Sequence, residues 1–143
     1  AAIERMHAAG VHLEITNLLI PGHNDSDRQI GDLVDFIAGL DRRIPLHLSA
    51  YRPAWKFDAP PTPVATLLRA REIAERRLDW VYLGNVVSDT GHDTRCPQCG
   101  AIVIGRSGYR ARVQLDPGGA CAKCGHLLPI VTGSRRSKDP RPE

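Results

Sequence analysis

The sequence predicts an α/β protein whose parallel sheet is followed by a small β module built around cysteines. Strand-like and helix-like segments alternate between residues 11 and 85, which is typical of βα units with parallel strands. The chain's four cysteines follow as two Cys-x-x-Cys-Gly pairs, in residues 96–100 and 121–125. Paired cysteines with this spacing indicate a metal site that holds a small segment folded.

The N-terminal segment predicts the end of a helix and then a strand. AAIERMHAAG has the composition of the last turns of a helix, with Gly10 as its stop. Because a domain seldom begins in this way, we expect a part of the protein upstream of Ala1. Residues 11–20 are rich in β-branched and long apolar side chains and end at a Pro-Gly turn, so they predict the first strand.

A helix is predicted over residues 26–40, with Asp25 or Ser26 as its N-cap. Its apolar side chains recur at helical spacing and form one stripe: Ile30, Leu33, Val34, Ile37 and Leu40. We therefore expect this helix to cover one face of the sheet.

Two further strands and a second helix complete the predicted βα units. PLHLSAY, residues 45–51, predicts a strand, and WVYLGN, residues 80–85, predicts another. Thr62 is the expected N-cap of the helix between them, which runs from Pro63 to about residue 77.

Polar side chains alternate with apolar ones along the first two strands. His12, Glu14 and Thr16 share one face of the first strand, and His47 and Ser49 share one face of the second. In a β/α barrel such a face lines the interior, whereas in an open sheet it faces solvent. The spacing alone leaves both architectures open.

The composition divides the chain into four parts. Residues 1–87 hold the βα units, 88–95 form a polar linker, 96–131 contain the cysteine module, and 132–143 form a charged tail. Since the tail has no apolar periodicity, we expect it to be disordered.

The cysteine module predicts a zinc ribbon. Cys96, Cys99, Cys121 and Cys124 can all reach one metal ion, and residues 101–115 predict a β-hairpin between the two pairs. Four thiolates also hold a single iron, so zinc and iron both remain open. Because four protein ligands leave no open position for a substrate, we expect this metal to be structural.

Charge and hydropathy limit the partners. The formal net charge is +3, and residues 132–143 account for +2 of it, which does not favour nucleic acid as a partner. No apolar run is long enough to span a bilayer, so we expect no membrane partner. Cysteines spaced for a metal favour a reducing compartment, and we expect a cytoplasmic location.

The basic residues of the cysteine module form a modest patch together with Tyr109: Arg95, Arg106, Arg110, Arg112 and Lys123.

Several segments together resemble one enzyme family. HLEITNLLIPGHNDSD, IPLHLSAYRPAWKF, PPTPVATLLRAREIA and WVYLGNV, followed by CPQCG and CAKCG, resemble the radical S-adenosylmethionine enzyme of the AmmeMemoRadiSam system, which is related to activating enzymes of pyruvate formate-lyase. The resemblance runs from Ala1 to about residue 130 and covers only the C-terminal portion of such an enzyme. It implies that residues 1–87 are the C-terminal part of a partial, TIM-like (β/α) barrel.

The resemblance also implies a reaction. In this family a [4Fe–4S] cluster reductively cleaves S-adenosylmethionine to a 5′-deoxyadenosyl radical, which abstracts a hydrogen atom from the substrate. The cluster is held by an N-terminal C-x-x-x-C-x-x-C motif that this chain does not contain. We therefore expect the chain to be inactive alone and to have no catalytic residue of its own, with its ribbon structural. The resemblance does not identify the substrate, and a companion protein is one candidate.

Four residues are expected near S-adenosylmethionine through the resemblance. Thr16, His47 and Ser49 lie on the predicted inner face, and Asn85 ends the last strand. Related enzymes often carry histidine just after the strand that corresponds to residues 45–51, where this chain has Arg52.

The alternative function is a free-standing zinc-ribbon module that binds nucleic acid or a partner protein.

Overall fold

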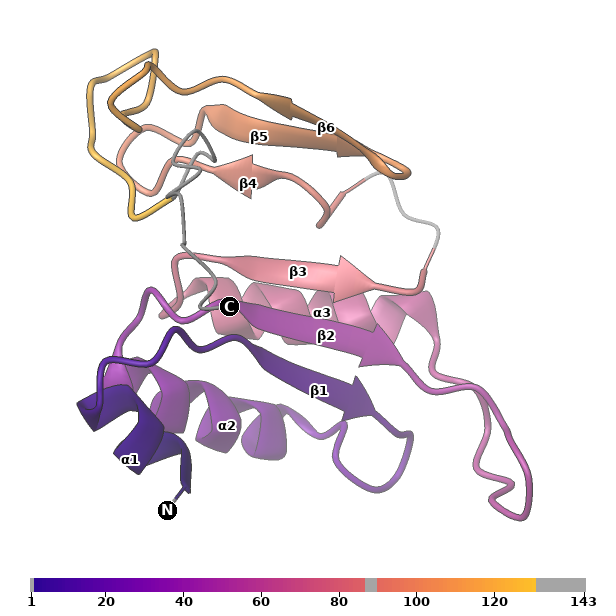
Figure 1. Cartoon of the computed structure of the whole chain (residues 1–143). Coiled ribbons are helices and arrows are strands. Elements are labelled where there is room, and N and C mark those ends of the chain that lie inside the picture. Colours follow the sequence, from indigo (N-terminus) through magenta and orange to yellow (C-terminus); the bar gives the residue numbers. More distant parts are fainter. Residues whose placement is uncertain (1, 87–89, 131–143) are drawn as a thin grey trace, which may run out of the picture. The chain divides into compact units, whose positions relative to one another are not determined.

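The computed structural model describes residues 2–86 and 90–130 and divides into two compact units (Figure 1). We call Ala1–Asp93 the α/β unit and Thr94–Glu143 the cysteine unit. Residues 87–89, which include the first two residues of the predicted linker 88–95, and the predicted disordered tail, residues 132–143, lie outside the described residues.

The α/β unit has the alternating elements that the sequence predicts. In chain order they are α1 (Ala2–Ala8), β1 (Ile15–Leu19), α2 (Asp27–Leu40), β2 (Leu46–Ala50), α3 (Val64–Glu75) and β3 (Val81–Gly84). The strands form one parallel sheet in the order β1-β2-β3. Its register places Thr16 beside His47 and His47 beside Tyr82. A mixed α/β fold with parallel strands is therefore confirmed.

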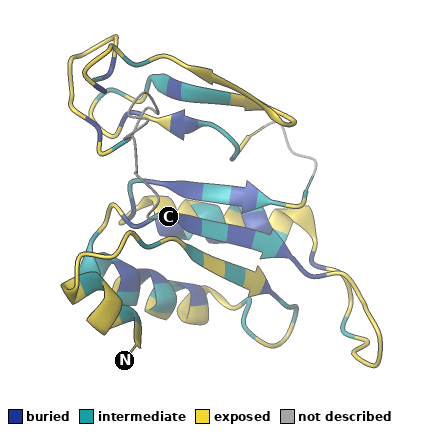
Figure 2. Cartoon of the chain, in the orientation of Figure 1, coloured by how far each residue is buried: buried dark blue, intermediate teal, exposed yellow. Residues whose placement is uncertain are grey.

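The core lies on one face of this sheet (Figures 1 and 2). Side chains from all three strands pack there against α2 and α3, and β2 alternates between buried and half-buried residues along its length. The fully buried members include Leu19, Ile30, Ile37, Leu48 and Leu67. The opposite face, which carries Thr16, His47 and Ser49, lacks this helical cover.

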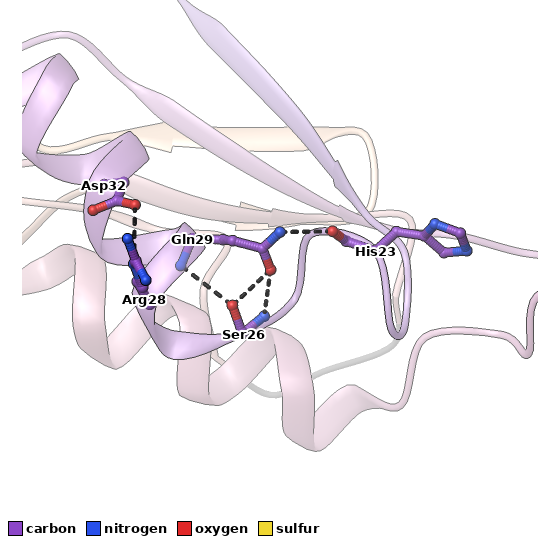
Figure 3. A network of polar contacts seen from close by, with 5 residues as sticks. All are labelled: His23, Ser26, Arg28, Gln29 and Asp32. Carbon is purple, nitrogen blue, oxygen red and sulfur yellow. Dashed lines mark hydrogen bonds and ion pairs between the residues drawn. The ribbon is translucent and has the colours of Figure 1, made fainter.

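Helix α2 begins at a capping box (Figure 3). The backbone N–H of Gln29 donates to Ser26 Oγ at 3.3 Å, and the backbone N–H of Ser26 donates to Gln29 Oε1 at 3.4 Å. Gln29 Nε2 also donates to the carbonyl of His23 at 2.7 Å, which fixes the turn before the helix. Ser26 is thus the cap, one of the two predicted residues.

Two elements differ from the sequence prediction because long-range contacts decide them. The first strand was expected over residues 11–20, yet β1 begins only at Ile15, opposite the first residue of β2, Leu46. Thr62 does not cap α3, since Pro63 occupies that position without a side-chain cap bond. Thr62 Oγ1 instead donates to the Leu19 carbonyl and accepts the N–H of Tyr51, so Thr62 ties together the ends of β1 and β2.

The cysteine unit contains a small antiparallel sheet. Its strands are β4 (Thr94–Arg95), β5 (Ile102–Ser107) and β6 (Arg110–Val113), in the order β4-β5-β6. The pairing of Ser107 with Arg110 closes the predicted hairpin. Apart from cysteines, only Val103 and Leu128 are buried apolar side chains among the described residues of this unit.

Candidate metal centre

The four cysteine sulfurs lie close together in the cysteine unit. Cys96 Sγ is 3.7 Å from Cys124 Sγ, and Cys99 Sγ is 3.8 Å from Cys121 Sγ. All four sulfurs lie within 4.8 Å of one another. A tetrahedral zinc with bonds of about 2.3 Å separates its sulfur ligands by about 3.8 Å. The four cysteines are therefore positioned to bind one metal ion.

Each cysteine pair is held by the same backbone pattern. The N–H of Gly100 donates to the Cys96 carbonyl at 2.8 Å, and the N–H of Gly125 donates to the Cys121 carbonyl, also at 2.8 Å. Both glycines have positive φ, 70° and 72°, a conformation that costs most other residues energy. Since each turn fixes both of its sulfurs, two matching turns together supply a four-thiolate site.

Backbone N–H groups favour one of these thiolates. The N–H groups of Cys124 and then Lys123 lower the pKa of Cys121 to about 7, because they hydrogen-bond its sulfur. The N–H of His126 favours the thiolate of Cys124 too, but burial and the thiols of the other three cysteines outweigh it and raise the pKa of Cys124 to about 12. Four thiols this close do not all ionise without a cation, so metal binding releases protons.

The donor set restricts the chemistry of the centre. Four sulfur ligands fit Zn²⁺ or a single iron ion. They fill the tetrahedral coordination of either ion, so a bound metal keeps no open position for a substrate. His126, which follows the second pair, is exposed and is not needed as a ligand.

The face of the parallel sheet opposite α2 and α3 brings three of the predicted cofactor residues together. Thr16 and His47 are adjacent across β1 and β2, and Ser49 lies one step nearer the C-terminal ends of the strands. His47 Nε2 lies 2.7 Å from Glu14 Oε2, and its ring stacks on Tyr82 with centroids 5.2 Å apart. His47 is thus held between Tyr82 on β3 and Glu14, the residue just before β1.

Glu14 lies between two histidines on this face. Its other oxygen lies 3.3 Å from His12 Nε2. Hydrogen bonds with His47 first and then His12 lower the pKa of Glu14, because they favour its charged form. Glu14 was not among the predicted site residues, although its place on the polar face of the first strand was visible in the alternation.

Ser49 and Asn85 have different surroundings. A Cβ atom at Gly84 would lie 2.9 Å from Ser49 Oγ, so the glycine opposite makes room for this hydroxyl. Asn85 has a positive φ of 49°. Its side chain accepts the N–H of Ala50 at 2.8 Å and donates to the Ala50 carbonyl at 2.9 Å. The structure therefore places Asn85 as a side-chain extension of the sheet beyond β3.

Comparison with known proteins yields one relative. No protein-family model and no solved structure matches the chain. The chain is 40% identical over 127 residues to an uncharacterized protein of Methanocaldococcus jannaschii, MJ0808. The match covers 85% of this chain but only 38% of the archaeal protein. Since the name of that protein states no activity, the likeness carries no function to this chain.

Among residues 2–86 and 90–130, none of the helices combines the length and the apolar composition needed to cross a bilayer.

Proposed function

We propose that this chain is the C-terminal part of a radical S-adenosylmethionine enzyme of the AmmeMemoRadiSam type, with a structural zinc ribbon. The observation that carries the proposal is the polar face of the parallel sheet, on the side opposite α2 and α3. The strands follow one another in the order β1-β2-β3, and both α2 and α3 pack on the same face. In β/α barrels the strands have this sequential order, the helices lie outside, and the free face lines the interior.

The side chains on that face suit a small polar cofactor. Thr16 and Ser49 offer hydroxyl groups, and His47 offers an imidazole that is oriented by Glu14. S-adenosylmethionine presents hydroxyl, amino and carboxylate groups, which such side chains bind through hydrogen bonds. When a [4Fe–4S] cluster is bound elsewhere in the enzyme, it supplies the electron that cleaves S-adenosylmethionine to a 5′-deoxyadenosyl radical. The role of this chain's residues is then to hold the cofactor in place.

The four cysteines do not suit that cluster. They surround one position from four sides, whereas a cluster that binds S-adenosylmethionine needs one iron without a cysteine ligand. The cysteine unit is therefore assigned a structural metal, zinc or iron, and the catalytic cluster is assigned to a separate motif of the same protein. The chain alone is inactive under this proposal.

Binding of S-adenosylmethionine to the natural, cluster-loaded protein tests the proposal. We expect Thr16→Ala, His47→Ala and Ser49→Ala each to weaken binding about twofold to tenfold, since one hydrogen bond contributes about 0.5–1.5 kcal/mol. His7→Ala, on α1, is the matched control and leaves binding unchanged. A protein that takes up no cluster, or binding that all three substitutions leave intact, contradicts the proposal.

A further inference from the structure

Charge is distributed unequally between the two units. The cysteine unit contains nine Lys/Arg against three Asp/Glu, a formal charge of +6, while the α/β unit contains ten against thirteen, a formal charge of −3. Residues 94–115, which include β4, β5 and β6, contain no Asp or Glu. Four thiolates around one divalent ion subtract two charges, and the cysteine unit stays positive.

Arginines of the two units differ in their surroundings. In the α/β unit, Arg42 lies 2.9 Å from Asp79 and Arg77 lies 2.6 Å from Asp35, so acidic side chains offset their charge. Arg110 is exposed on β6 and forms no ion pair with another residue of the described ranges. The same holds for Arg112. Such uncompensated positive charge attracts a polyanion, and binding releases the counterions of that polyanion.

Strand β6 places these two arginines on one face of the β5–β6 hairpin. Arg110 and Arg112 are two residues apart on β6, so they point to the same side, about 6.8 Å apart. Their partners on β5 are Ser107 and Gly105. Because both partner residues are small, their side chains do not cover the guanidinium groups on this face.

An aromatic ring lies at the tip of the same hairpin. Tyr109 lies in the turn beside Gly108, whose φ is 56°, and its side chain is completely exposed. A fully exposed tyrosine contributes nothing to a core. Beside two arginines it is the arrangement that binds single-stranded nucleic acid, in which a base stacks on the ring and phosphates contact the cations.

We propose that the β5–β6 hairpin binds single-stranded nucleic acid, with Arg110 and Arg112 on phosphates and Tyr109 stacked on a base. A single strand is favoured over a duplex because a base must expose its face to stack on Tyr109. Nucleic acid is favoured over an acidic protein because an acidic surface gives the exposed ring no planar partner. The basic residues of this unit are few, but three of them, Arg106, Arg110 and Arg112, lie on one hairpin that contains no Asp or Glu.

Fluorescence anisotropy on the full zinc-loaded chain tests the proposal. The probes are single-stranded RNA and DNA of about twelve nucleotides, within the site sizes known for such proteins, a duplex of the same length, and heparin as a polyanion without bases. We expect the single strands to bind more tightly than the duplex. We also expect binding of the single strands to weaken as salt rises.

Three variants assign the contacts. The double variant Arg110→Ala/Arg112→Ala lowers the slope of log affinity against log salt by about 1.4 in magnitude, since each phosphate contact on a single strand contributes about 0.7. Tyr109→Ala weakens binding about fivefold or more with little change in slope, and Tyr109→Phe retains binding because stacking persists. Metal content and amide spectra confirm that each variant is folded.

A matched control variant and three contrary results complete the test. The double variant Arg28→Ala/Arg76→Ala removes two exposed arginines of the α/β unit and leaves binding unchanged. Heparin affinity that equals single-strand affinity, together with no effect of Tyr109→Ala, indicates binding by charge alone without base stacking and overturns the proposal. Equal affinity for the duplex, or no binding at low salt, overturns it as well. These outcomes are independent of cofactor binding by the α/β unit.

Discussion

Removing the metal is expected to unfold the cysteine unit and leave the α/β unit folded. The two units have unequal cores. Fourteen buried residues form the core of the α/β unit, whereas the buried apolar side chains in the described part of the cysteine unit are Val103, Leu128 and two of the cysteines, Cys96 and Cys121. Without a metal, little remains to hold the two cysteine turns together.

The expected magnitude follows from this difference. Burial of Val103 and Leu128 contributes about 1.5–3 kcal/mol each, so the apolar contribution is about 3–6 kcal/mol. Structural zinc sites contribute about 10–16 kcal/mol to folding near neutral pH. The metal is therefore the larger stabilising contribution, and its loss leaves the cysteine unit without a stable fold.

Hydrogen exchange with and without a zinc chelator measures the effect for each unit. The N–H groups of Gly100, Gly125 and Cys121 are hydrogen-bonded in the structure, and we expect them to exchange slowly only in the metal-loaded chain. Amides in the middle of α2 stay protected in both samples. A Cys99→Ser variant reproduces the result without a chelator, because it removes one ligand.

Two outcomes contradict this reasoning. If the cysteine-unit amides stay protected after the metal is gone, its fold rests on contacts other than the metal. If α2 loses protection together with the cysteine unit, the two units do not fold independently. Metal content is measured on the same samples, so that incomplete removal is recognised.

Three smaller perturbations test the α/β unit. Ser26→Ala removes the capping box and is expected to lower the free energy of unfolding by about 0.5–2 kcal/mol in urea titration, whereas Ser26→Asp keeps most of it. Gly84→Ala drives a methyl group against Ser49 Oγ at 2.9 Å and is expected to lower the thermal midpoint, with Ser49→Gly restoring it; no restoration means that another contact causes the loss. The lowered pKa of Glu14 stabilises the fold above its unfolded pKa, and this contribution is lost as the pH falls through the lowered folded pKa. In Glu14→Gln the free energy of unfolding should depend less on pH in that acidic range. The difference should be less than about 1 kcal/mol, because the pair is partly exposed. An unchanged pH profile contradicts the pairing with His47.

Features that depend on nearby residues were predictable from the sequence. The cap, which the sequence limited to Asp25 or Ser26, and the apolar stripe that follows it both depend on residues of the same helix. The two cysteine turns depend on four consecutive residues and a glycine, so their spacing alone predicts the grouping of the sulfurs that the structure has. The hairpin turn at Gly108 and Tyr109 is equally local.

Features that depend on register were not predictable. Thr62 reaches the Leu19 carbonyl, 43 positions away, and no local pattern records such a partner. Asn85 hydrogen-bonds the backbone of Ala50, 35 positions away, and this partner too could not be found from a local pattern. The alternation along β2 placed His47 on the polar face, but its contacts with Glu14 and Tyr82 follow from how three strands align.

The most direct measurement is the reading frame upstream of Ala1 in the source DNA, together with the intact mass of the natural protein and its iron and sulfide content after anaerobic purification. The account predicts a continuous frame that contains C-x-x-x-C-x-x-C, and a protein that holds a [4Fe–4S] cluster besides one metal ion at Cys96, Cys99, Cys121 and Cys124. A natural protein without that motif, whose only metal is the ion at the four cysteines, contradicts the radical-enzyme proposal and leaves the cysteine unit as the source of its function.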